Sequence, residues 1–124
     1  MALTLETVLR NALADQIDVQ VNGGTGTAQL KIENNADAGL ATFNLQDPPF
    51  GTAATGTITL AGTPLQDTNA NAGTAAQFSI FNKSAVKQLE GTCGTGADDI
   101  VISSTNIGLG DTVELTSFSI TVPA

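Results

Sequence analysis

Ala28-Gln29-Leu30-Lys31-Ile32-Glu33-Asn34-Asn35-Ala36-Asp37-Ala38-Gly39-Leu40-Ala41-Thr42-Phe43-Asn44-Leu45-Gln46 is the stretch that decides the fold. Apolar and polar residues alternate in its first and last parts, 28–33 and 40–46, and a polar turn over 34–39 separates them. Successive side chains of a strand point to opposite faces, so Leu30 and Ile32 share one face of the first run. The alternation predicts two strands, each buried on one side.

The same pattern of short alternating runs and polar turns continues to the end of the chain. Further alternating runs lie at 56–61, 75–82, 86–90, 99–104 and 112–122, and the turns between them lie at 47–51, 62–64, 67–73, 91–96 and 106–111. In the last run the apolar positions change parity between Leu115 and Phe118, which requires a bulge or a change of sheet. Short strands separated by such turns predict a mainly β fold over about 27–123, an antiparallel β-sandwich that is jelly-roll-like or Ig-like.

A single N-terminal helix is predicted over about 4–21. Thr4 suits the N-cap, Glu6 suits the first turn, and Asn22-Gly23-Gly24 ends the element. The apolar positions that follow helical spacing are Leu5, Val8, Leu9, Ala12, Leu13 and Ile17. We expect this apolar face to be buried against the sandwich or against another subunit. Residues 17–21 also alternate with period two, so a strand remains open there.

Length and composition limit the function classes. The chain has 124 residues, enough for one domain over 1–124. Its net charge of −8 disfavours nucleic acid, because phosphate binding needs clustered basic residues and the chain has only 4. No apolar run approaches the ~18 residues of a membrane span. No signal peptide is expected either, because the N-terminus lacks a basic and an apolar region.

An enzyme is not expected. The sequence has no His and one Cys, so Cys93 has no imidazole to activate it. Residues 67–73 resemble a calcium loop but lack its Gly and Glu positions, and Gly23–Thr27 lacks the Lys of a phosphate loop. The doublet Asp98-Asp99 is expected to solvate the start of a strand. We therefore expect no catalytic residue, metal, cofactor or small-molecule substrate.

Pro48-Pro49-Phe50 allows two interpretations. The prolines fix an extended backbone and so place the Phe50 ring. That ring either fills the core under a turn, which we favour, or inserts into a partner. The residues that we consider for an interface are Leu5, Leu9, Leu13, Pro48, Pro49 and Phe50.

Several motifs together resemble a group of small structural proteins of tailed bacteriophages. They are Leu40–Gly51 (LATFNLQDPPFG), Gly73–Phe78 (GTAAQF), Gly94–Ile100 (GTGADDI) and Ser117–Pro123 (SFSITVP), behind a helical opening over Leu9–Val21. The resemblance spans most of the chain. It implies a virion component with a β-sandwich behind an N-terminal helix.

Within that group, the composition favours a capsid cement (decoration) protein. Charged residues make up only 13% of the chain, about half the usual ~25%, which lowers the desolvation cost of wide contacts. The expected partners are further copies, as a homotrimer, and the major capsid protein on the capsid exterior. The chain ends are expected to be packed by neighbouring subunits. The alternatives are a tail, neck, baseplate or short-fibre subunit, and a receptor- or carbohydrate-binding module.

Overall fold

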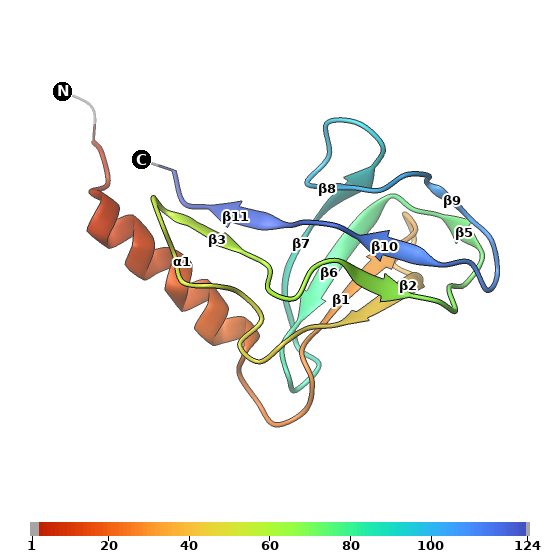
Figure 1. The fold of residues 1–124 in the computed structure, drawn as a ribbon, viewed down its shortest axis with the longest axis horizontal. Helices are drawn as coiled ribbons and strands as arrows, with labels where there is room; N and C mark the ends of the chain where they lie inside the picture. The colour runs from red at the N-terminus through yellow and green to blue at the C-terminus, as the bar shows by residue number, and fades with distance from the viewer. Residues whose placement is uncertain (1–2, 124) are drawn as a thin grey trace.

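The computed structural model describes residues 3–123 and confirms a mainly β fold with one N-terminal helix (Figure 1). The helix is α1 (Thr7–Val21). The strands are β1 (Gln29–Glu33), β2 (Gly39–Asn44), β3 (Thr57–Thr59), β4 (Leu65–Asp67), β5 (Gly73–Thr74), β6 (Gln77–Phe81), β7 (Lys87–Gly94), β8 (Ile100–Val101), β9 (Asn106–Ile107), β10 (Val113–Leu115) and β11 (Ser119–Thr121). The chain ends expected to be packed, residues 1–2 and 124, lie outside the described residues.

The largest sheet has the order β2-β1-β6-β7-β8 and curls into a half-barrel. Its pairs are antiparallel except for β7 and β8, which are parallel. The register places Leu30 opposite Phe43 on one side and Ile80 on the other. The apolar positions of the alternating runs therefore converge on the concave side of the sheet.

Two short ladders face this concave side and complete the core. The predicted break in the last run is confirmed as a change of partner: β10 pairs with β4, and β11 pairs with β3. Phe118 lies between β10 and β11 and packs edge-on against Phe78, with ring centroids 5.2 Å apart. Its ring centroid lies 6.3 Å from that of Phe50. These rings join the ladder side to β6. A third short ladder pairs β5 with β9.

The boundaries of α1 differ from the prediction. The helix begins at Thr7, not near Thr4, because Glu6 is extended at its N-cap position. It continues to Val21, so the strand considered for 17–21 is wrong; the Asn22 N–H donates to the Asp18 carbonyl and closes the last turn. Within the described residues, no helix has the length and hydropathy needed to cross a membrane.

The strand boundaries also need correction. β7 extends to Gly94, through residues predicted as a turn, because its last part pairs with β8. β5 and β9 fall at the edges of predicted turns, and β4 lies between two of them. Each of the three spans only 2 or 3 residues, too short for an alternation to be recognised.

Candidate functional site

The helix α1 is held to the rest of the chain by its polar side. Three side chains accept hydrogen bonds from backbone N–H groups of the 50–56 loop. These bonds are Gly56 N–H to Asn11 Oδ1 (2.7 Å), Ala53 N–H to Asp15 Oδ1 (2.9 Å) and Phe50 N–H to Asp18 Oδ1 (3.0 Å). The acceptors are spaced by four and three residues, which puts them on one side of the helix. They satisfy N–H groups that the loop cannot pair within a sheet.

Arg10 extends the same polar side toward the end of the chain. Its Nε donates to the Val122 carbonyl at 2.8 Å, and its Nη2 donates to the Thr55 carbonyl at 3.1 Å. Gly56 makes room for the guanidinium: its φ is +76°, and an added Cβ would lie 2.7 Å from Arg10 Nη2. Ala14, fully buried, lies on the docked side and allows close approach.

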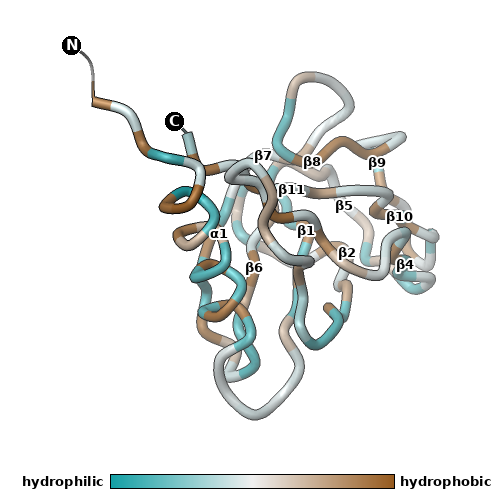
Figure 2. Tube along the Cα trace, turned by 60° about the vertical axis from the view of Figure 1, so that its left-hand side comes forward, coloured by the Kyte–Doolittle hydropathy of each residue, from teal (hydrophilic) through white to brown (hydrophobic). Residues whose placement is uncertain are grey.

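Because the polar side is docked, the apolar side of α1 faces outward. Val8 is 82% exposed, Leu9 48% and Leu13 43%. The expected burial against the sandwich is therefore wrong for Val8, Leu9, Ala12 and Leu13, whereas Ile17 packs against the core as expected. Burial of the exposed positions against another subunit stays a prediction. We call these residues the outer face of α1: Val8, Leu9, Ala12, Leu13, Gln16, Val19 and Gln20. None of them is charged, and Figure 2 shows hydrophobic positions recurring along the turns of the helix.

A groove continues the outer face toward β7. It has a volume of about 260 Å³. Its lining consists of Leu13, Gln16, Ile17, Gln20, Val21, Gln88 and Leu89. The aliphatic side chains supply apolar surface, and the three glutamine amides supply hydrogen-bond donors and acceptors without charge. This combination suits the face of a protein partner.

The Pro48–Phe50 turn does not belong to this surface. Phe50 is 2% exposed and Pro49 is buried, whereas Pro48 is exposed. The favoured interpretation, in which the Phe50 ring fills the core under the turn, is therefore confirmed, and Pro49 and Phe50 are excluded as interface residues. Asp18 holds the Phe50 backbone, and the ring lies near Phe118. Leu9 and Leu13 of the original candidates lie on the exposed surface, and Leu5 is half-buried.

Asp18 is a partly buried carboxylate of the docked side. Burial raises the pKa of its carboxyl above the ordinary value of 3.8, and the Phe50 N–H bond opposes that rise. Neighbouring Asp15 and Asp47 add to it by like-charge repulsion. At the end of α1, Asp47 has a lowered pKa, because Lys83 Nζ (2.7 Å) and Asn22 Nδ2 (2.9 Å) donate to it.

We expect Asp18→Asn to be stabilising at pH 7. The amide oxygen can still accept the Phe50 N–H, while the partly buried negative charge is removed. Because the folded state raises this pKa, the native chain loses stability as the pH rises from the unfolded value, about 3.9, through the folded one. Urea unfolding at pH 3 to 7 should show that loss in the native chain and a smaller one in the variant. Lower stability of Asp18→Asn at pH 7 would contradict this assignment.

The acidic motifs singled out in the sequence stabilise loops. Asp67 accepts the N–H of Asn69 through Oδ1 (2.9 Å) and that of Thr42 through Oδ2 (2.8 Å). Asp99 Oδ2 accepts the Thr92 N–H at 3.0 Å, just before β8 begins. Within residues 3–123, no cluster of three or more His, Cys, Asp or Glu side chains could hold a metal ion.

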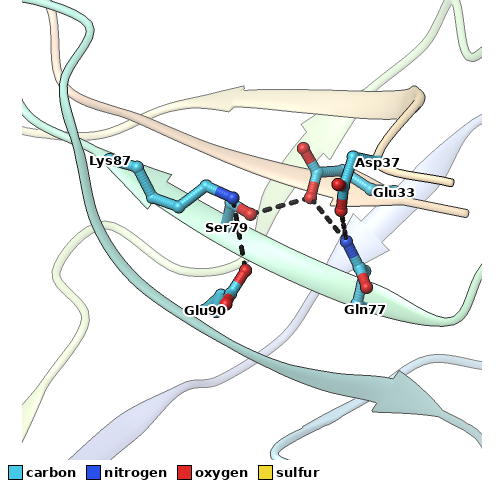
Figure 3. A network of polar contacts seen from close by, with 6 residues as sticks. All are labelled: Glu33, Asp37, Gln77, Ser79, Lys87 and Glu90. Atoms are coloured by element: carbon cyan, nitrogen blue, oxygen red, sulfur yellow. Dashed lines mark hydrogen bonds and ion pairs between the residues drawn. The ribbon is translucent and has the colours of Figure 1, made fainter. Parts of the chain in front are cut away.

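A second polar network covers the convex side of the sheet (Figure 3). Glu33 is buried, and its Oε1 accepts the Ser79 hydroxyl at 2.7 Å and the Gln77 amide at 3.3 Å. The Gln77 amide also donates to Asp37. These bonds tie the β1–β2 turn to β6 across the register shift at Glu33. The network stabilises the sheet, because the buried Glu33 carboxylate accepts hydrogen bonds from side chains of β6.

Cys93 lies buried on the concave side of β7. Burial, reinforced by the nearby Asp98 carboxylate, raises the pKa of its thiol to about 11. A thiol reagent at pH 8 should therefore react very slowly with the folded chain and fully with the chain in guanidinium, because the thiolate is the nucleophile. Labelling followed by mass spectrometry measures this, and rapid labelling of the folded chain would show that the thiol is accessible.

Comparison with known proteins finds no matching family model, no matching curated protein and no matching solved structure. The function proposed below therefore rests on the geometry of the chain and on the resemblance of its sequence motifs.

Proposed function

We propose that this chain is a non-enzymatic structural protein of a phage particle, a cement protein that binds the outside of the capsid through the outer face of α1. The observation that carries the proposal is the orientation of the helix. The polar side chains of the helix accept hydrogen bonds from the 50–56 loop of the same chain, and an uncharged, largely apolar face is exposed. Contiguous exposed apolar surface is uncommon on proteins that act alone and marks interaction sites.

The chemistry of the outer face matches a protein partner. Amphipathic helices bind apolar grooves through side chains at helical spacing, as Leu9 and Leu13 are spaced here. The acidic residues of α1, Asp15 and Asp18, face inward and do not oppose such a contact. The chain's net charge of −8 favours the capsid exterior over contact with packaged DNA.

Many weak contacts are enough to reinforce a capsid. Each copy adds modest apolar contact across a boundary between capsomers, and repetition over the shell multiplies the effect. Copies joined as a homotrimer would fit a threefold position of the shell, since closed symmetry is the usual arrangement of identical subunits. The shell then resists internal pressure better.

Particles made without this protein test the proposal. They should lose DNA on heating more readily than complete particles, and added protein should restore resistance at hundreds of copies per particle. A Leu9→Asp/Leu13→Asp variant should not restore it. The matched control is Leu109→Asp, at a leucine 78% exposed in the β9–β10 loop. Unchanged DNA retention, or a handful of copies located at the tail, would replace cement with a tail, neck, baseplate or fibre subunit.

A further inference from the structure

The half-barrel is open between β7 and β11. We call this opening the seam; its volume is about 320 Å³. It is lined by Phe78, Leu89, Glu90, Asp99, Phe118, Ser119, Ile120 and Thr121. The side chains of Phe78, Leu89, Phe118 and Ile120 give it apolar walls, and these residues belong to the core or pack against it.

A strand edge borders the seam on each side. Within the described residues, the Lys87–Gly91 part of β7 pairs with β6 alone, because Asp99 already accepts the Thr92 N–H and the pairing with β8 begins at Cys93. β11 pairs with β3 on one side and with no described strand on the other. Unpaired strand edges are templates for another extended segment.

The chain itself contains a segment suited to this place. Leu3–Glu6, which we call the arm, precedes α1 without helix or strand structure, and Glu6 has extended angles. Its apolar and polar residues alternate, as in a strand buried on one side. Leu3 is 90% exposed, and Figure 1 shows the segment leading away from β7.

We propose that the arm of one copy adds as a strand to the seam of a second copy. Leu3 and Leu5 would point toward the apolar walls, and Thr4 and Glu6 toward water. Backbone hydrogen bonds to the free edges supply affinity, and the alternating side chains supply register. The arm and the seam are different surfaces of the molecule, so the contact is head-to-tail; such contacts form a closed ring, for example a homotrimer, where the rotation between copies closes, and an open filament where it does not. This contact between copies does not depend on the role at the capsid.

Charge variants at neighbouring arm positions test the contact. Leu3→Asp should shift the chain to monomer in sedimentation equilibrium, weakening association at least tenfold, because it places a carboxylate against the apolar walls. Thr4→Asp, with the same charge at the adjacent position, should associate within about threefold of the native chain, because Thr4 faces water. Equal effects of the two variants, or a native chain that is monomeric at all concentrations, would overturn the proposal.

Disulfide trapping tests which copy supplies the arm. One chain carries Thr4→Cys and the other Ser119→Cys, an exposed position of β11; the native Cys93 is buried and does not compete. Mixing them should give a disulfide-linked pair containing one of each, and a Leu109→Cys chain in place of the Ser119→Cys chain should not. No mixed pair, or a concentration-independent disulfide within a chain carrying both Thr4→Cys and Ser119→Cys, would overturn exchange between copies. These outcomes concern association alone, so the capsid role is decided separately by the particle experiment.

Discussion

Phe118→Ala is expected to lower the free energy of unfolding by about 3–5 kcal/mol, the usual cost of removing a buried aromatic ring. The ring lies between β10 and β11 and packs against Phe50 and Phe78, so its loss leaves a cavity where the ladders meet the main sheet. Domains of this kind have only about 5–15 kcal/mol of stability in total. The loss should therefore be a large fraction of the total stability, and urea denaturation of the variant and the native chain measures it.

Leu109→Ala is the matched control for that experiment. Its side chain is largely exposed, so the expected change is within about 0.5 kcal/mol. A loss below 1 kcal/mol in Phe118→Ala would show that the three rings do not form the central contact of the core.

Asp15→Ala combined with Asp18→Ala is expected to lower the free energy of unfolding by about 3 kcal/mol. The double substitution leaves the N–H groups of Ala53 and Phe50 without acceptors, and a buried unpaired group costs about 1–3 kcal/mol. The helix should also undock, which amide hydrogen exchange along α1 would detect as lost protection.

The matched control for the docked side is Gln16→Ala combined with Gln20→Ala on the outer face. Both glutamines are exposed, and alanine has a high helix propensity, so stability should change by less than about 0.5 kcal/mol. Equal losses in the two double variants would contradict polar docking of the helix.

The main strands could be predicted because their alternation and their burial have the same cause. A strand with one buried side must alternate, so the runs over 28–33 and 40–46 identify β1 and β2 within a residue or two. The parity change before Phe118 predicted a bulge or a change of sheet in the last run, and the structure shows the second, because β10 and β11 have different partners. The choice of which strands pair, such as the parallel pairing of β7 with β8, has no comparable pattern in the sequence.

The orientation of α1 could not be predicted from periodicity. Apolar residues and the polar residues Asn11, Asp15 and Asp18 both recur at helical spacing, and the usual assumption buries the apolar set. The polar side docks here because the 50–56 loop, which follows Pro48 and Pro49 and ends at Gly56, presents backbone N–H groups that need acceptors. The only sequence signal for this was the spacing of these acceptors.

The docking of α1 through its polar side also explains why some interface candidates are exposed and others are buried. Leu9 and Leu13 lie on the exposed surface because the helix docks through its opposite side. Phe50 is buried because its backbone is fixed by Asp18 and its ring has an aromatic neighbour in the core. The groove beside Leu89 was not foreseen, since it forms between segments about 70 residues apart in the chain.

The central claim is that the outer face of α1 is free in the single chain and serves to bind a partner. The most direct measurement compares the native chain with Leu9→Asp/Leu13→Asp in urea unfolding and in binding to particles that lack the protein. We predict a loss of no more than about 2 kcal/mol in the free energy of unfolding, because both side chains are only about half buried, together with a loss of binding of at least a hundredfold. A loss of several kcal/mol in stability, or binding equal to that of the native chain, would contradict the claim.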